Sequence, residues 1–410
     1  MVPVARVTLA KNLARAVRGG HPWIYRDALR PPAVPLVDGA LVEVAARDGR
    51  PLGRGFWTAS TPIAVRMLSL DPRDDIDTLT AARLQAALQR RLEFIDRTRT
   101  NAFRWVHGEA DGLPGVHLDV YDRYASVRFD GPGARAFYRG LPVQVMDVGR
   151  ALDLVALLER VPRGGRSGGV STAASSAGSD AAEGAQALIG RPPAGEIDVR
   201  ENGLRFGVDL VHGQKGGLFL DQRDNRQRVG AMARGRRVLN LFGYTGGFSV
   251  YAAAGGASET TTVDSAKAAI ASAAENFRRN GLPSTHAEFV ATDAFRFLAD
   301  AAAAGRRWDL VISDPPSFAP NRRALNDALA SYRRLHRLCA AVTAPDGILC
   351  AASCSSHVGA AAFLASVESG ARDAGRRFQL TEMHDAGGDH PTMAAFPEGH
   401  YLKFAVGTLG

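Results

Sequence analysis

The segment at residues 238–248, VLNLFGYTGGF, constrains the fold more than any other part of this chain. Its first residues form a short apolar run that suits a buried parallel strand. The run breaks into a glycine-rich turn at 243–247, and an alanine-rich helical pattern follows. Glycines let the backbone approach a ligand closely, and a helix offers free N–H groups at its N-terminus. The segment therefore predicts a strand, a turn and a helix that cradle a cofactor.

From about residue 195 onward, strand-like and helix-like patterns alternate, which predicts a parallel sheet covered on both faces. A hairpin is expected over 197–210, and further strands are expected at 259–263, 287–291, 308–312, 347–352, 378–383 and 401–406. Polar residues follow four of these strands in turn, namely Asp264, Asp293, Asp314 and Cys354. Ligands bind at the carboxyl ends of strands in open α/β sheets. We therefore expect these four side chains at one edge of the sheet, with Asp264 near ribose hydroxyls.

Earlier parts of the chain predict other domains. Residues 1–70 contain four short strand-like runs and predict a small β domain, whereas 71–162 predict a central α+β segment with an amphipathic helix at 76–97. Residues 163–195 begin with a low-complexity stretch that lacks large apolar side chains, so we expect a linker or inserted loop there. Residues 196–410 then hold the alternating pattern.

Charge and cysteine content narrow the class of protein. The net charge is +8, and residues 1–70 hold ten basic against four acidic residues. A basic N-terminal module fits a domain that binds a polyanion, although only four of the 50 basic residues are lysine, which also fits an arginine-rich genome. Three cysteines close in sequence argue against a disulfide framework. No apolar run is long enough to span a membrane and no signal peptide is visible, so a soluble, cytoplasmic protein is expected.

The turn at 243–247 does not have the G-x-G-x-x-G spacing of nicotinamide dehydrogenases. The segment Asp314-Pro315-Pro316-Ser317-Phe318 is also unexplained by that class. Two prolines fix the backbone after a strand, so the Asp314 carboxylate and neighbouring carbonyls are held in place. Together with Phe318 as a stacking surface, this suits the binding of a planar, nitrogen-bearing ring such as a flipped base.

These motifs resemble class I S-adenosylmethionine-dependent methyltransferases over roughly residues 196–410. A narrower resemblance covers almost the whole chain, to the large-subunit ribosomal RNA cytosine-5 methyltransferases with an N-terminal PUA domain, the RlmI type. It rests on motifs in the family's order: His21-Pro22-Trp23, Gly108-Glu109-x-Asp111-Gly112-Leu113-Pro114-Gly115, Glu201-Asn202-Gly203, Gly213-Gln214-Lys215, Leu220-Asp221-Gln222-Arg223, the segment from Asn240 to Phe248, Asp314-Pro-Pro-x-Phe318, Ser353-Cys354-Ser355, Asp389-His390-Pro391, and Pro397-Glu398-Gly399-x-Tyr401-Leu402-Lys403. One departure is Gly216, where the family often has Thr.

The resemblance implies an α/β fold: a Rossmann-like methyltransferase domain with a seven-stranded, mostly parallel sheet, preceded by a small β PUA-like domain and a central α+β segment. It implies S-adenosyl-L-methionine as the cofactor, with Asp264 on the ribose, Asp293 on the adenine amino group and the turn near the methionine part. The expected cofactor contacts are Asn240, Phe242, Tyr244, Thr245, Gly246, Gly247, Asp264, Ser265, Asp293, Ala294, Asp314, Gln222 and Arg223. The expected RNA contacts are His21, Trp23, Lys215 and Phe318, and no metal ligand is assigned.

The chemistry of cytosine assigns roles to two residues. Its C5 is a poor nucleophile, so a thiolate must add at C6 before C5 can take a methyl group. Cys354 is the candidate thiolate, and Asp314 is the candidate for hydrogen bonding or protonation near N3. The base that removes the C5 proton stays unassigned. Cys354 has a competing interpretation as a small buried strand residue, which is how we interpret Cys350.

Three functions fit the sequence. The first is a methyltransferase that forms 5-methylcytosine in large-subunit ribosomal RNA through a covalent Cys354 adduct. The second keeps the fold but methylates an exocyclic nitrogen of an RNA base, without a covalent step. The third is a non-catalytic RNA-binding or ribosome assembly factor. The modified nucleotide, the form of the RNA substrate and the oligomeric state stay open, with a homodimer as one option. For Trp23, a base-stacking role and a place in the core of the small domain are both open.

Overall fold

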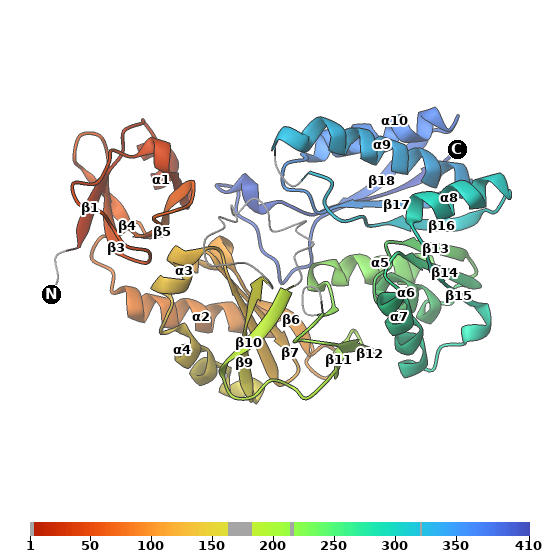
Figure 1. Ribbon diagram of the computed structural model, residues 1–410, viewed down its shortest axis with the longest axis horizontal. Helices are drawn as coiled ribbons and strands as arrows, with labels where there is room; N and C mark the ends of the chain where they lie inside the picture. The colour runs from red at the N-terminus through yellow and green to blue at the C-terminus, as the bar shows by residue number, and fades with distance from the viewer. Residues whose placement is uncertain (1–3, 163–182, 214–216, 320–321) are drawn as a thin grey trace.

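The computed structural model describes residues 4–162, 183–213, 217–319 and 322–410. The N-terminal β domain lies at one end of the molecule, the methyltransferase-like sheet lies at the other, and the central domain lies between them (Figure 1).

The N-terminal domain is a five-stranded sheet in the order β1-β3-β4-β5-β2. Its elements are β1 (Ala5–Thr8), α1 (Ala14–Arg18), β2 (Trp23–Tyr25), β3 (Leu41–Ala45), β4 (Pro51–Trp57) and β5 (Ile63–Ser69). The four predicted strands are confirmed. A further strand, β2, which the sequence did not predict, pairs antiparallel with β5. Alternating side chains such as Val42 and Val44 are buried in the core, as expected for strands with one covered face.

The central domain is a second five-stranded sheet, in the order β10-β9-β8-β7-β6. Its elements are α2 (Ile76–Leu92), β6 (Ala102–His107), η2 (Gly108–Asp111), β7 (Val116–Tyr121), β8 (Tyr124–Phe129), α3 (Pro132–Phe137), α4 (Leu141–Val148), η3 (Gly149–Leu152), β9 (Ala156–Pro162) and β10 (Glu183–Ile189). The fully buried Trp105 anchors α2 to this sheet, because its Nε1 donates to the carbonyl of Leu84 at 3.0 Å.

The linker expected over 163–195 needs correction. Residues 183–189 form β10, which pairs antiparallel with β9 at the edge of the central sheet. Low apolar content does not prevent this pairing, because an edge strand gains backbone hydrogen bonds from its one neighbour. Residues 163–182 lie outside the described part of the chain.

A two-stranded hairpin, β11 (Ile197–Glu201) and β12 (Leu204–Val208), precedes the largest sheet. Its turn residues Asn202 and Gly203 have positive φ angles of 51° and 88°, as the Asn-Gly pair predicts. The buried carboxylate of Glu201 accepts two hydrogen bonds from Arg226, at 2.8 and 2.6 Å, and so ties the hairpin to helix α5 (Arg223–Met232).

The largest sheet has seven strands in the order β15-β14-β13-β16-β17-β19-β18 within the described residues. The strands are β13 (Arg237–Leu241), β14 (Glu259–Asp264), β15 (Ala287–Ala291), β16 (Trp308–Ser313), β17 (Thr343–Ser353), β18 (Phe378–His384) and β19 (Lys403–Leu409). The first five run parallel, whereas β19 is antiparallel to both β17 and β18. The predicted order of strands along the chain is confirmed.

Helices cover both faces of this sheet (Figure 1). Besides α5, they are α6 (Gly247–Ala254), α7 (Lys267–Arg279), α8 (Ala294–Ala303), α9 (Leu325–Val342) and α10 (Ala360–Asp373). Leu239 and Leu241 pack in the core beneath α8, α9 and α10, whereas Val238 packs in the core beneath α5 and α6. This alternation follows from the two-residue period of a strand and explains why the strands are apolar on both faces. None of the described helices is both long and apolar enough to cross a membrane.

Candidate functional site

The glycine-rich turn after β13 is held by Asp264. The backbone N–H of Tyr244 donates to Asp264 Oδ2 at 2.9 Å, and that of Ala266 donates to Oδ1 at 2.9 Å. Phe242, Tyr244 and Gly246 all have positive φ angles, of 56°, 47° and 79°. Two non-glycine residues with positive φ are uncommon in one turn, and such backbone strain concentrates at ligand sites. Asp264, the expected ribose ligand, therefore also fixes the turn that precedes α6.

The glycines in this turn are needed for internal packing. A Cβ atom at Gly246 would lie 2.8 Å from the Cβ of Ala273 on α7. A Cβ at Gly247 would lie 2.9 Å from Cδ of Arg226, and one at Gly243 would lie 2.6 Å from Cγ2 of Thr262. The turn thus packs directly against its neighbours, and the close approach of its backbone to a ligand stays a prediction.

Asn240 and Thr245 support this turn from below. Asn240 is buried, and its Nδ2 donates to Ser249 Oγ at 2.9 Å, while its Oδ1 accepts no hydrogen bond from the described residues. The Thr245 hydroxyl is buried and donates to the Gly217 carbonyl at 3.4 Å. Helix α6 begins at this point with no side-chain cap, so its N-terminal N–H groups are available to a carboxylate.

The expected adenine side of the site lies at the ends of β14 and β15. Asp293 is exposed and caps α8, because its side chain accepts a hydrogen bond from Arg296 N at 2.9 Å. Ser265 is exposed beside Asp264. Ala294 is buried in the core under α8, so its side chain is a packing residue. These residues lie at the carboxyl edge of the parallel strands, as predicted.

The two candidate catalytic loops are joined directly. Ser317, three residues after Asp314, shares a hydrogen bond of 2.7 Å between its Oγ and that of Ser355, next to Cys354. The hydroxyl of Tyr332 on α9 lies 3.3 Å from Ser355 Oγ, so α9 supports the same junction. Because β16 and β17 are neighbours in the sheet, this junction places Asp314 and Cys354 at one edge. Phe318 packs against Tyr332, with ring centroids 4.8 Å apart, and is only partly exposed.

The three cysteines differ in environment. Cys339 and Cys350 are fully buried, and burial raises the pKa of both thiols, to about 12 for Cys339. A thiol with a raised pKa is a poor nucleophile near neutral pH. Cys354 is partly exposed just beyond the end of β17. Its environment is that of an accessible residue, unlike that of Cys350.

Gln222 and Arg223 are neighbours in sequence but bind different carboxylates. Gln222 is buried and donates from Nε2 to Asp314 Oδ2 at 2.9 Å, so it orients that carboxylate. Arg223 donates from two nitrogens to the carboxylate of Asp389, at 3.0 and 3.1 Å, and from Nε to Asp224. The guanidinium of Arg223 is therefore held in a buried ion pair, which differs from the expected contact with a methionine carboxylate or with RNA.

Residues 385–402, which connect β18 to β19, form a C-terminal strap that contacts all three domains. Asp389 in the strap accepts from Arg223, and its carbonyl accepts from Arg91 of the central domain at 2.7 Å. Phe396 packs edge-on against Trp23 of the N-terminal domain, with ring centroids 4.6 Å apart. In Figure 1 the strap crosses the space between the N-terminal and methyltransferase-like domains.

Trp23 does not lie in the core of the small domain, so that interpretation is wrong, whereas its base-stacking role stays a prediction because it lines the pocket described below. It is buried, its Nε1 donates to Glu109 Oε1 of the central domain at 2.7 Å, and it lies outside the core of the small domain. It is an interdomain contact. His21 accompanies it, since its Nε2 lies 3.5 Å from Glu398 Oε1 in the strap. Lys215, the other basic residue expected to bind RNA, lies outside the described residues.

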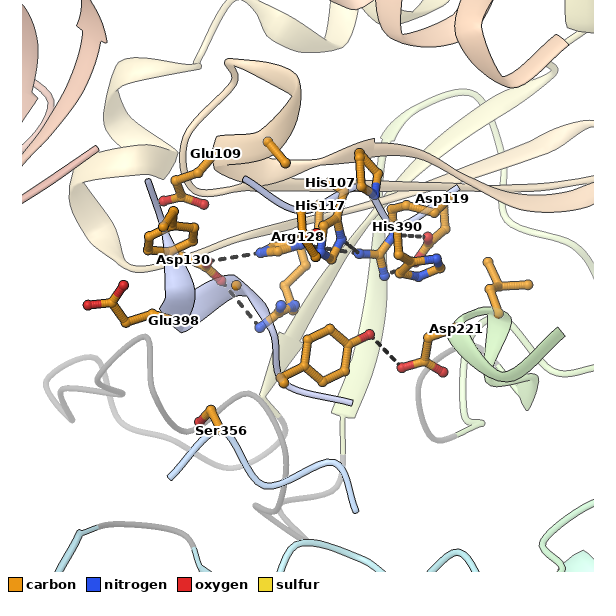
Figure 2. A pocket seen from close by; sticks show the side chains of 18 of the residues that line it. His107, Glu109, His117, Asp119, Arg128, Asp130, Asp221, Ser356, His390 and Glu398 are labelled. Atoms are coloured by element: carbon orange, nitrogen blue, oxygen red, sulfur yellow. Dashed lines mark hydrogen bonds and ion pairs between the residues drawn. The ribbon is translucent and has the colours of Figure 1, made fainter. Parts of the chain in front are cut away.

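A pocket of about 490 Å³ opens where the three domains meet. Figure 2 shows His107, His117 and His390 close together in it, with Ser356 on the opposite side of the view. Ser356 and His357 follow Cys354 in sequence, so the pocket adjoins the loop that carries the candidate thiolate. None of the residues that hold the glycine turn lines it. Phe219, which does line the pocket, packs edge-on against Tyr244 of the turn, with ring centroids 5.4 Å apart, so the pocket lies next to the expected cofactor site.

The pocket is polar, and five carboxylates against three arginines line it. Arg104 pairs with Asp119, and its NH1 lies 2.9 Å from His107 Nδ1 and 3.2 Å from His117 Nδ1. Because a guanidinium only donates, both Nδ1 atoms are acceptors and both rings carry their proton on Nε2. Burial lowers the pKa of both histidines, which keeps them neutral. On the other side, Tyr401 donates its hydroxyl to Asp221 Oδ2 at 2.7 Å.

Sequence reasoning missed most of these pocket residues. Arg104, His117 and Asp119 lie on β6 and β7 and show no motif beyond an ordinary strand pattern. Asp221, His390 and Tyr401 belong to motifs that were noted but had no role assigned. The alternation of large polar residues on β7, with His117 and Asp119 on one face, is the signal that points to a polar cavity.

Comparison with known proteins agrees with this geometry. A family described as S-adenosylmethionine-dependent methyltransferase matches residues 179–395, and a PUA-like domain family matches residues 7–70. A solved methyltransferase structure complexed with SAH is 22% identical, with a TM-score of 0.83 over 98% of this chain and 100% of that chain. A SAM-dependent methyltransferase structure from Streptococcus mutans is 21% identical, with a TM-score of 0.81 over the same shares. These two likenesses concern the fold.

Curated relatives are closer in sequence. The protein named ribosomal RNA large subunit methyltransferase I from Aeromonas salmonicida is 34% identical over 98% of each chain. A protein named ribosomal RNA large subunit methyltransferase from Deinococcus radiodurans is 36% identical over 98% of this chain and 96% of its own. With a PUA-like N-terminal domain and a cofactor edge built on β13 to β17, this chain belongs to the S-adenosylmethionine-dependent methyltransferases, in the family of ribosomal RNA large subunit methyltransferase I.

Proposed function

We propose that this protein methylates C5 of a cytosine in large-subunit ribosomal RNA, through a covalent bond between Cys354 and the base. One observation carries the proposal: the loop with Cys354 is joined to the loop with Asp314 by the 2.7 Å hydrogen bond between Ser355 and Ser317. A thiol and a carboxylate thus lie together at the cofactor edge, which is the pair that this reaction needs. We infer the substrate class from the relatives, which are named as methyltransferases of the ribosomal RNA large subunit.

The residues at the sheet edge fit S-adenosyl-L-methionine. The uncapped N-terminus of α6 suits the methionine carboxylate, and Asp264 lies where it can accept from ribose hydroxyls while it holds the turn. Asp293 and Ser265 are exposed where the adenine is expected. When bound, the cofactor supplies a methyl group on a sulfonium.

The protein residues then divide the remaining work. The Cys354 thiolate adds to C6 of cytosine, and the electron pair of the C5–C6 double bond moves through C4 toward N3. Asp314, as a carboxylic acid, donates its proton to N3 and takes it back when the base is released. Gln222 holds Asp314 in the required orientation, because its Nε2 donates to Oδ2. C5 could then bond to the methyl carbon that the bound cofactor would supply, as the bond from that carbon to the sulfonium sulfur breaks. A base removes the C5 proton, the C6–S bond breaks, and Cys354 is regenerated as a thiolate.

RNA reaches these loops through the pocket between the domains, in our proposal. The pocket adjoins Cys354 through Ser356 and His357, and its walls come from all three domains. The histidines His107 and His117 are neutral, which suits an uncharged base better than a phosphate. The basic N-terminal domain then contacts the phosphate backbone outside the pocket.

Substitution of Cys354 tests the covalent step. Cys354→Ala is expected to abolish transfer of labelled methyl groups to undermodified ribosomal RNA, whereas Cys350→Ala, which changes a buried residue within β17, retains it. Nucleoside mass spectrometry of ribosomal RNA from cells with and without the protein identifies the product. A Cys354→Ala enzyme that methylates at the full rate contradicts the covalent step and, with a product methylated on an exocyclic nitrogen, favours the second function. Binding of RNA without any methyl transfer by the wild type favours a non-catalytic factor.

A further inference from the structure

Lys403 is a buried lysine beside the catalytic loops. It is one of only four lysines in the chain, and it is 4% exposed. It begins β19, where it pairs with Ser353 at the end of β17. Long ammonium side chains are almost never fully buried unless they are paired. Its position therefore calls for a physical reason.

The ammonium group lies on the loop that carries Cys354. Nζ donates to the carbonyl of Ser355 at 2.5 Å and to the carbonyl of Tyr401 at 2.7 Å. Both acceptors are neutral. Among the described residues no carboxylate forms an ion pair with Lys403, and Asp385 acts on it only through space. The two carbonyls fix the position of the positive charge without neutralising it.

Such an arrangement is costly unless a negative charge is close. Burial lowers the pKa of Lys403 to about 8, and the thiolate charge of Cys354 opposes this effect. An uncompensated buried cation costs several kcal/mol by desolvation, which an adjacent anion offsets. Ser353, which precedes Cys354, pairs with Lys403 in the sheet. Ser355, which follows Cys354, accepts a hydrogen bond from Nζ of the same lysine. Both neighbours of Cys354 in the chain therefore contact Lys403.

We propose that Lys403 is a positioning residue that keeps Cys354 in its thiolate form. The proposal rests on the proposed role of Cys354 as the nucleophile. A neighbouring ammonium favours the thiolate over the thiol because opposite charges attract. Lys403 gives up no proton in this role. The Lys403 ammonium pairs with the Cys354 thiolate when no base is bound. The ammonium loses this partner when the sulfur bonds to C6. Its return to the ion pair favours release of the base at the end of the cycle.

Other groups near Cys354 do not supply this charge. Tyr332 from α9 and Tyr401 from the strap both interact electrostatically with Cys354. Burial raises the pKa of Tyr332 to about 12 and that of Tyr401 well above its usual value, so both are neutral phenols near neutral pH. Asp314, on the neighbouring loop, and Asp385, in the strap, are carboxyl groups, which carry no positive charge in either protonation state. Lys403 is the cation that the described residues place on this loop.

Alkylation of Cys354 by iodoacetamide measures the effect without any RNA. The full-length protein is labelled at a series of pH values, and peptide mass spectrometry follows Cys354 apart from the buried Cys339 and Cys350. The wild type is expected to react with a midpoint below about 8.5, the ordinary value for cysteine. Lys403→Met is expected to raise the midpoint by about one pH unit, which slows labelling at pH 7 about tenfold. Lys403→Arg, which keeps the charge, is expected to restore most of the rate.

Two controls keep the result interpretable. Lys267→Met removes an exposed lysine at the start of α7 and is expected to leave the midpoint unchanged. Thermal unfolding shows whether Lys403→Met is folded. If this variant is not folded, the alkylation midpoints of the wild type and of Lys403→Arg decide whether Lys403 favours the thiolate. An unchanged midpoint in folded Lys403→Met, or a wild-type midpoint at or above 8.5, overturns the proposal. If the midpoint shifts as expected but Cys354→Ala still methylates RNA, the charge pairing stands and the proposed covalent function fails.

Discussion

Two arginine–aspartate pairs in this protein have the same bidentate geometry and opposite burial. Arg223 donates to Asp389 at 3.0 and 3.1 Å, and Arg333 donates to Asp373 at 2.6 and 2.7 Å. The Asp389 side chain is fully buried and that of Arg223 is 6% exposed, whereas Arg333 is 56% exposed. Replacement of each aspartate by asparagine removes one charge and keeps the shape. The comparison sets a buried pair against an exposed one.

The buried pair is expected to matter far more. Burial raises the pKa of a carboxyl, but His390 and Arg223 together hold the pKa of Asp389 well below its usual range, so it is charged at neutral pH. Asp389→Asn leaves the Arg223 guanidinium buried with Asp224 as its remaining partner. Loss of one partner from a buried pair costs about 3–5 kcal/mol. Asp389 also accepts from the backbone N–H of Arg104 at 2.8 Å, so the strap loosens from the central domain as well.

Urea unfolding followed by circular dichroism measures the difference. Asp389→Asn is expected to lower the unfolding midpoint strongly, while Asp373→Asn has no measurable effect because water solvates the exposed Arg333. Limited proteolysis is expected to cut the strap faster in Asp389→Asn. Equal midpoints for the two variants would refute the reasoning, since only Asp389 is buried and also bonded to Arg104 and His390.

Three further outcomes follow from the geometry. Gly246→Ala is expected to weaken S-adenosylmethionine binding in calorimetry and to cost about 1–3 kcal/mol of stability, because it combines a positive φ with a clash at Ala273. Gly305 also has a positive φ but has open space around it, so Gly305→Ala is expected to leave cofactor affinity unchanged. Burial lowers the pKa of His336 to about 4 in the folded state. The unfolded state therefore binds a proton below about pH 6.5, whereas the folded state binds it only below about pH 4. Stability is therefore lost as the pH falls through this window, by roughly 3 kcal/mol at its lower end, and His336→Phe should remove that part of the pH dependence of thermal unfolding. Trp23→Phe removes the hydrogen bond to Glu109 and is expected to cost about 1–3 kcal/mol of stability; a loss of RNA affinity with unchanged stability would instead support base stacking.

The sequence was sufficient for the strands of the large sheet because each is a short apolar run with a clear end. The parallel order of β13 to β17 then places Asp264, Asp293, Asp314 and Cys354 at one edge, by a rule that needs no side-chain detail. The strand β10 was missed because an edge strand next to a low-complexity stretch has few apolar residues, and its pairing with β9 depends on backbone hydrogen bonds that composition does not encode.

The pocket between the domains could not be predicted from local sequence patterns. Arg91 and Asp389 are 298 residues apart, yet the Arg91 guanidinium donates to the Asp389 carbonyl. Trp23 was assigned to the wrong surroundings for the same reason, since its partners Glu109 and Phe396 come from the other two domains. Spacing along the chain carries no information about such contacts, because they depend on how complete domains pack. Arg223 shows the converse: an arginine in a recognised motif was expected to face a ligand, but the fold supplies it with a carboxylate.

The strand β19 has a consequence for synthesis on the ribosome. It lies between β17 and β18 in the sheet but is made after both of them. During translation the earlier strands therefore emerge with a vacant position between them, and the gap fills only when residues 403–409 leave the ribosome. Lys403 arrives with that strand. A nascent chain that still lacks β19 has the carboxyl ends of β13 to β17 but not the lysine that we propose to pair with Cys354, so the proposed thiolate site is complete only after this strand has been inserted.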